Sequence, residues 1–484
     1  MRALFIKALR GQVAVEALVR LRSLLVLPIA TRLLGTTGYG QIAVAAAITG
    51  LVGTVATLGM PSALARFLPG KETDDERARL FWPAFASCAV TVVACAGLTI
   101  AVFAAVPSAH HDLPLALVVV AALNVVSNEL KLFLYSFWRV NVEFDQYYRF
   151  LIADTVAVAA AQLAVLLLLH KGAIAVVASL VVVDAVVLGV AVLLLSRRLP
   201  WHRPSLSLVG PLYRYGLPLG FTALLIWANN AADRFFVQAY RGTDAVGLYS
   251  VGYNLGVIGV AIVGTPMVSI VSSLMFRAWD RGEREEAERL PRNCATLLVL
   301  ACLPLILSLA YFGRPLVELL AGSAFAGAHD YVALVGVGYL LLHLGVLFGY
   351  PLWLHNRQYL YSLSMVASVV VNIGLNAALV PPYGAYGSAV ATTASLGVLA
   401  AGLVVWNLRG GYSRPPIALP VAMAAIAVAC WTLAGLVWPS EPTIVDTIAF
   451  SGVTTAAFAA ALVALRLVPS ELRPGFLRRR LAAS

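Results

Sequence analysis

The chain contains fourteen apolar segments, most of them 20 residues or longer, separated by short polar turns. They centre on residues 13–33, 41–61, 81–106, 113–136, 148–169, 173–195, 213–236, 246–275, 293–312, 330–350, 359–380, 385–408, 417–437 and 445–468. A helix needs about 20 apolar residues to cross a bilayer, and only helices or closed barrels satisfy all backbone groups in lipid. These segments lack the alternating pattern of barrel strands. The sequence therefore predicts an all-α polytopic membrane protein with about 14 transmembrane helices.

The polar remainder of the chain is too small for a soluble domain. Only 12% of the residues are charged, whereas a soluble domain carries about 25%. The longest polar stretches, residues 196–211 and 277–292, have the length of loops. Nearly the whole chain is therefore expected to lie in the membrane.

Lysine and arginine are distributed unevenly between the two sets of loops. With a cytoplasmic N-terminus, 26 of the 34 lie in inner loops and helix ends, five lie outside and three lie within helices. Cytoplasmic loops of membrane proteins carry such an excess. We expect both termini to lie in the cytoplasm and the chain to span the cytoplasmic (inner) membrane. The bias also accounts for most of the net charge of +11, so no nucleic-acid partner is expected.

The chain also repeats itself. Similar stretches occur at Gly35–Gln41 and Gly242–Tyr249, at Lys71–Leu80 and Arg281–Leu290, and at Lys171–Ala175 and Tyr383–Gly387. The three pairs are offset by 207, 210 and 212 residues. We predict two parallel six-helix halves, residues 1–200 and 201–410, followed by two additional transmembrane helices and a basic cytoplasmic tail in residues 411–484. Parallel repeats are typical of transporters that bind substrate between the halves.

The patterns that indicate enzyme or metal chemistry do not occur. The five cysteines lie in apolar segments without a CxxC pair or zinc spacing, as buried small residues do. No GxxxxGK[ST] motif is present, which excludes nucleotide-driven transport by this chain alone. We expect no enzyme activity, no catalytic residue, no metal and no cofactor.

Several stretches carry a family resemblance. They are Thr31–Gly40 with Leu58–Phe67, Ala232–Phe236 with Val246–Ser250, and Asn372–Val380 with Tyr383–Thr392. In this order, over about residues 10–410, the chain resembles the polysaccharide flippase branch of the multidrug/oligosaccharidyl-lipid/polysaccharide exporter superfamily.

The resemblance implies a function. The chain would move a polyprenyl-diphosphate-linked oligosaccharide across the cytoplasmic membrane by alternating access, for cell-surface polysaccharide synthesis. Its partners would be that lipid-linked substrate and membrane lipids, and could include a polysaccharide polymerase and glycosyltransferases. Two alternatives of the same superfamily stay open, a cation-coupled multidrug antiporter and a lipid II flippase. A membrane-embedded glycosyltransferase would need a carboxylate pair at the membrane surface, and Asp74-Asp75 lies in a mixed charge run typical of a solvated face.

The implied diphosphate makes cations inside the membrane the candidate substrate contacts, because a bare anion there is costly. Gln12, Glu16, Arg20 and Ser23 share one face of the first segment, which favours Arg20 as a phosphate contact. Arg22 lies about 200° round the same helix. Alternatively, either arginine extends to the cytoplasmic headgroups.

Two further segments supply polar candidates for substrate binding. Lys131 lies on a polar stripe of the fourth segment, close to its inner end, where it could also extend to the headgroups. Asn229, Asn230 and Arg234 form a cluster with Asp233 in the seventh segment, the repeat equivalent of the first. An interfacial ion pair and contacts between helices are the alternatives there.

Carboxylates inside the membrane are candidates for ion coupling, because such groups carry protons or sodium in transporters. The candidates are Glu16, Glu129, Asp154, Asp184 and Asp233. Asp154 and Asp184 have no cation nearby in the sequence.

Overall fold

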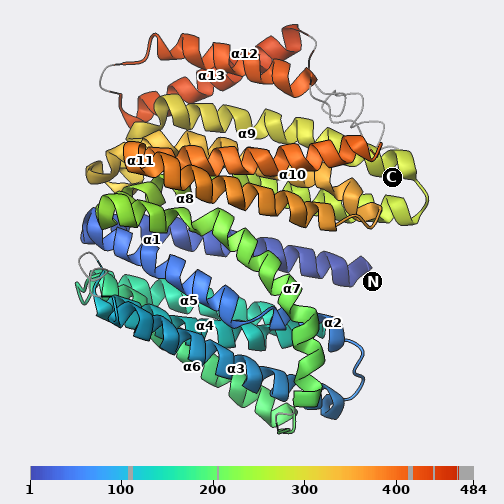
Figure 1. Cartoon of the computed structure of the whole chain (residues 1–484). Helices are drawn as coiled ribbons and strands as arrows, with labels where there is room; N and C mark the ends of the chain where they lie inside the picture. Colours follow the sequence, from blue (N-terminus) through green and yellow to red (C-terminus); the bar gives the residue numbers. More distant parts are fainter. Residues whose placement is uncertain are drawn as a thin grey trace. The chain divides into compact units, whose positions relative to one another are not determined.

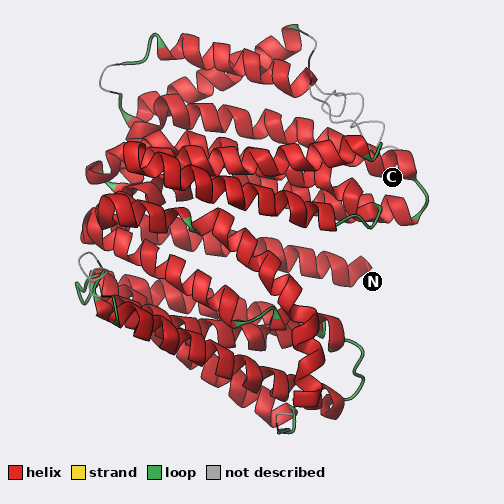
Figure 2. Cartoon of the chain, viewed as in Figure 1, coloured by secondary structure: helices red, strands yellow, loops and turns green. Residues whose placement is uncertain are grey.

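The computed structural model describes residues 2–106, 113–203, 206–412, 418–439, 442–465 and 467, and every regular element in these ranges is a helix (Figures 1 and 2). The helices are α1 Arg2–Ala56, α2 Met60–Phe67, α3 Asp74–Ala104, α4 Leu115–Val140, α5 Phe144–Leu167, α6 Ala173–Arg198, α7 Leu206–Ala231, α8 Asp233–Asp280, α9 Arg284–Ala321, η2 Ser323–Ala328, α10 His329–Leu354, α11 Tyr359–Arg409, α12 Ala418–Gly435 and α13 Ile444–Ala464. Within these described ranges, eleven helical segments are long and apolar enough to cross a membrane. The predicted all-α polytopic class is confirmed.

Three long helices are broken at glycines that adopt positive φ. The breaks are Gly35 in α1 (φ 65°), Gly242 in α8 (φ 78°) and Gly384 in α11 (φ 59°). Glycine adopts this region readily because it has no Cβ, whereas other residues rarely do. Each break lies where the sequence predicts that one crossing ends and the next begins.

The helices group into two compact units, Met1–Gly247 and Leu248–Ser484. In the first unit α4 is the central helix. Of its most apolar stretch 61% is buried inside the protein, whereas the corresponding value for α3 is 17%. Aromatic rings fill the space between them, and Phe81 packs against Phe137 at a centroid distance of 5.0 Å. The indole of Trp82 donates to the backbone oxygen of Leu199 at 3.2 Å, which ties α3 to the end of α6.

In the second unit α10 packs against both α9 and α11. The two parts of α11 are joined across Gly384 by polar contacts. Ser388 donates to the side-chain oxygen of Asn376 at 2.7 Å, and the amide of Asn372 donates to the Ser395 hydroxyl at 3.1 Å. These asparagines lie in the core of the unit and hold its helices together.

Helices α12 and α13 pack on α9, as Figure 1 shows for the orange-red pair of ribbons. Trp431 of α12 is fully buried and donates to the Ser308 hydroxyl of α9 at 3.1 Å. Phe312 of α9 lies 4.4 Å from the ring of Trp438. Buried aromatic rings therefore anchor the C-terminal pair to its unit.

Candidate functional site: a buried charge cluster in the N-terminal unit

Three charged side chains meet inside the first unit, one from each of three helices. Lys131 of α4 lies 2.8 Å from Asp154 of α5 and 2.5 Å from Asp184 of α6, measured from the ammonium nitrogen to a carboxylate oxygen. The three residues are only 4%, 8% and 4% exposed. A lysine ammonium has three donors and no acceptor, so it suits a position between two carboxylates.

The remaining carboxylate oxygens of this cluster differ from each other. The second oxygen of Asp184 accepts a hydrogen bond from the Asn124 amide at 3.0 Å. The second oxygen of Asp154 is buried and has no hydrogen-bond partner among the described residues. A buried acceptor without a partner is costly. Binding of a proton or a small cation at this oxygen would therefore stabilise the cluster most.

Two more charged residues surround the cluster. Arg22 of α1 is close enough to be attracted to both Asp154 and Asp184. Glu129 of α4 interacts with Lys131 and Asp184, accepts from the Asn128 amide at 3.1 Å, and lies against Gly53 of α1. We call these five residues, Arg22, Glu129, Lys131, Asp154 and Asp184, the charge cluster. With every group ionised, three carboxylates face two cations, which leaves one negative charge.

The charge cluster changes the interpretation of several candidates. Lys131 does not reach the headgroups, because it is buried and bound by two carboxylates. Asp154 and Asp184 do have a cation, although it is 23 and 53 residues away in the sequence. Arg20 is half-buried, and the side chain of Glu16 lies outside the described part of the chain.

The polar residues of the seventh segment lie where the chain breaks between α7 and α8, at Ala232. The Arg234 guanidinium donates to the backbone oxygen of Asn230 at 2.9 Å and to the Asp233 carboxylate at 3.0 Å. Asn229, Asp233 and Arg234 are all buried. Arg234 therefore contacts Asn230 through the backbone oxygen of that residue.

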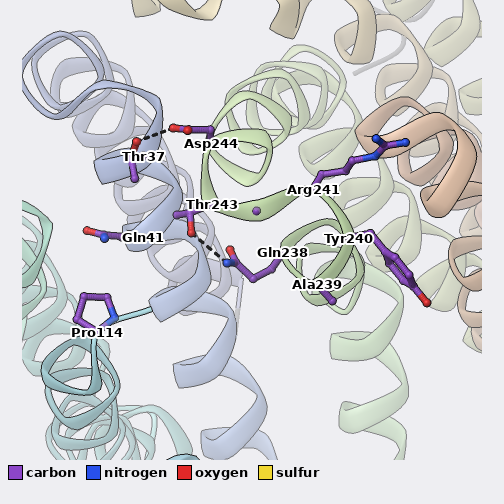
Figure 3. Close-up of a pocket in the computed structure, with 10 residues that line it drawn as sticks. Thr37, Gln41, Pro114, Gln238, Ala239, Tyr240, Arg241, Thr243 and Asp244 are labelled. Atoms are coloured by element: carbon purple, nitrogen blue, oxygen red, sulfur yellow. Dashed lines mark hydrogen bonds between the residues drawn. The ribbon is translucent and has the colours of Figure 1, made fainter. Parts of the chain in front are cut away.

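Sequence reasoning missed a second polar feature of this unit, a cleft of about 640 Å³ beside the Gly242 break. Its walls come from the segments that follow Gly35 and flank Gly242 (Figure 3). The signal in the sequence is the repeated Gly-Thr stretch at residues 35 and 242, which indicates repetition but does not by itself indicate a cleft.

The long apolar helices and the lack of strands in the described ranges define an all-α polytopic membrane protein. Residues 29–330 match the family described as polysaccharide biosynthesis protein, and the chain belongs to that family. No curated protein sequence matches it.

Several solved transporters and flippases have a similar fold. A lipid II flippase, MurJ, in an inward closed conformation is 12% identical, with a TM-score of 0.75 over 93% of this chain and 98% of its own. An inward-facing multidrug resistance MATE transporter of the MOP superfamily is 16% identical, with a TM-score of 0.58 over 80% and 94%. A MOP superfamily transporter from Pyrococcus furiosus is 16% identical, with a TM-score of 0.50 over 84% and 94%.

Proposed function

We propose that this protein moves a polyprenyl-diphosphate-linked oligosaccharide across the cytoplasmic membrane by alternating access. The carrying observation is membership of a polysaccharide biosynthesis family by a chain built of membrane-crossing helices. Such a chain contributes to polysaccharide synthesis most directly by moving its lipid-linked intermediates. The fold similarity to a lipid II flippase over 93% of the chain supports the same assignment.

The proposal includes fourteen crossings, with two parallel six-helix repeats, two additional C-terminal helices and both termini in the cytoplasm. The breaks at Gly35, Gly242 and Gly384 support this number, because each divides a long helix into two lengths. Gly35 and Gly242 have nearly the same conformation, with ψ of −171° and 179°. Equivalent breaks at equivalent positions are what a duplication would leave.

For substrate binding we propose Arg20 as the principal diphosphate contact, with Asn229, Asn230 and Arg234 as further polar contacts. Arg20 is half-buried on α1, and the sequence pattern favours it as the phosphate contact. Lys131 and Arg22, candidates on the sequence alone, have carboxylate neighbours in the charge cluster. We therefore assign these two cations to the ion-coupling site.

For ion coupling we propose the charge cluster itself. Its one excess negative charge and the unpartnered oxygen of Asp154 favour uptake of one proton or one sodium ion. Uptake would neutralise a buried charge that is otherwise costly. Buried carboxylates also fit the second candidate function, a cation-coupled drug antiporter, and substrate tests decide between the two.

The test uses purified protein in proteoliposomes with a fluorescent oligosaccharide on undecaprenyl diphosphate. We expect the protein to expose labelled glycan to a membrane-impermeant quencher, and Arg20→Ala to lower the initial rate at least tenfold. Arg66→Ala is the matched control, because Arg66 is an exposed arginine of α2. Equal rates in protein-containing and empty vesicles would falsify the flippase assignment, and export of cationic dyes without glycan transfer would favour the antiporter.

A further inference from the structure

The two segments that follow Gly35 and Gly242 pack against each other in a reciprocal way. A Cβ at Gly40 would lie 2.0 Å from the backbone oxygen of Thr243, and a Cβ at Gly247 would lie 2.1 Å from the backbone oxygen of Thr36. The two contacts correspond to each other under the offset of 207, because Gly40 matches Gly247 and Thr36 matches Thr243. At a two-fold interface, a contact between two positions is repeated with the roles of the two segments exchanged. Small residues such as glycine permit two helices to approach this closely.

Hydroxyl groups and one carboxylate hold this contact together. Thr36 and Thr37 both donate to the same oxygen of Asp244, at 2.8 and 2.5 Å. Because the helices touch through their backbones, the side chains beside the contact are fixed relative to one another. We call this contact the glycine seam.

The cleft of about 640 Å³ opens directly beside the glycine seam. Its polar lining residues are Thr37, Gln41, Gln238, Arg241, Thr243 and Asp244, as Figure 3 shows. The Gln238 amide nitrogen donates to the Thr243 hydroxyl at 3.0 Å. The amide oxygen has no partner among the described residues and is itself buried, so it becomes an acceptor for a ligand when the amide turns toward the cleft.

The chemistry of this lining selects among ligand classes. The lining contains one cation, Arg241, and one carboxylate, Asp244, whose side chains point in opposite directions (Figure 3). The net charge of the cleft is therefore zero, and it offers no excess positive charge to a diphosphate. Amides, hydroxyls, one cation and one carboxylate offer both donors and acceptors, which match the hydroxyl groups of a sugar. The Tyr240 side chain at the rim is 54% exposed and points away from Gln238 and Thr243 (Figure 3). The volume lies within the usual range for small-molecule sites, about 300–1,000 Å³.

We propose that this cleft binds a sugar unit of the transported glycan. The proposal rests on the proposed function, and it places the site at the turns that the charge distribution assigns to the outer side of the membrane. The glycan would contact the cleft after its diphosphate has left the cations of the first helix. The cleft would then select the sugar, whereas Arg20 would recognise the diphosphate of every substrate.

The test compares two probes with protein in nanodiscs, undecaprenyl diphosphate carrying an oligosaccharide and undecaprenyl diphosphate alone. Gln238→Leu removes the unpartnered acceptor, and we expect it to weaken binding of the glycan-bearing lipid about fivefold, as the loss of one hydrogen bond does. Binding of the bare lipid should stay unchanged. Gln41→Leu tests the opposite wall, and Gln146→Leu in α5, outside the cleft, is the matched control.

The outcomes separate this site from the proposed function. If Gln238→Leu and Gln41→Leu bind both lipids as the wild type does, the site is refuted, and transport by the wild type would still support the flippase. If the variants bind glycan less well but the wild type moves no lipid, the site stands and the flippase assignment fails. Equal affinity for the free oligosaccharide would identify a soluble saccharide as the ligand and overturn the assignment to the transported lipid. Thermal unfolding midpoints equal to wild type show that the variants are folded.

Discussion

Removal of the Lys131 ammonium is the sharpest perturbation of the charge cluster. In Lys131→Met a side chain of similar length loses its charge, and Asp154 and Asp184 are left buried beside each other. At 2.8 and 2.5 Å, each ion pair is worth about 6–7 kcal/mol of Coulomb attraction at an effective dielectric constant of about 20. Desolvation offsets most of this, and removing one partner of a buried pair costs about 3–5 kcal/mol.

This cost should be visible in thermal unfolding of the protein in nanodiscs. One kcal/mol corresponds to about 2–4 °C for domains of 150–250 residues, so we expect the midpoint to fall by roughly 6–20 °C. Lys171→Met is the control, because Lys171 is exposed in the loop between α5 and α6, and its midpoint should stay within about 1 °C of wild type, as for most surface substitutions.

The triple variant Lys131→Met, Asp154→Asn, Asp184→Asn separates a lost attraction from an unpaired charge. It removes all three charges, and replacing a whole buried ion pair is often close to neutral. We expect it to recover most of the loss. A triple variant as unstable as Lys131→Met would refute the reasoning, and so would a single variant that melts with the wild type.

Three further predictions address other parts of the molecule. Gly40→Ala would place a Cβ 2.0 Å from the Thr243 oxygen, so the helices must separate by about 1.4 Å to restore an ordinary contact. We expect the free energy of unfolding to fall by about 1–3 kcal/mol. Gly97→Ala is the control and should not destabilise the protein, because Gly97 has open space around it. Asp154→Asn removes the excess negative charge of the cluster, so transport should lose its dependence on a sodium or proton gradient, and a variant that still responds to either gradient would contradict the coupling assignment. Partial burial lowers the pKa of His355 below its ordinary value. The unfolded chain therefore takes up the proton first, and the free energy of unfolding should fall as the pH drops below about 6.5. Hydrogen exchange at the imidazole carbon of His355 should report a titration midpoint under that value.

The class of fold could be predicted because membrane crossing depends on each helix by itself. Twenty apolar residues predict a crossing regardless of which helices surround it, so the segments and the breaks at Gly35, Gly242 and Gly384 could be located without tertiary information. The polar stripe of α4 that carries Lys131 was also predictable from the sequence, and Lys131 does contact Asp184.

The partners of that stripe could not be predicted. Helical periodicity tells which residues of α4 share a face, but it does not tell which helix lies opposite. Lys131 and Asp184 are 53 residues apart, and only the packing of α4 against α6 brings them together. The same limit applies to the glycine seam, since the offset of 207 indicated equivalence between two segments but gave no reason to expect contact.

The charges of the N-terminal unit limit what can recognise the substrate diphosphate. Lys131 is bound by carboxylates, and Arg22 is attracted to the same two groups. Arg234 is held by Asp233 and by the backbone of Asn230. Each of these cations therefore faces an anion that a diphosphate would have to displace. Uptake of a proton or sodium ion by the charge cluster would cancel its excess negative charge. Arg22 of the cluster and Arg20 both belong to α1, so this negative charge disfavours a diphosphate at Arg20, and substrate binding and ion uptake would favour each other.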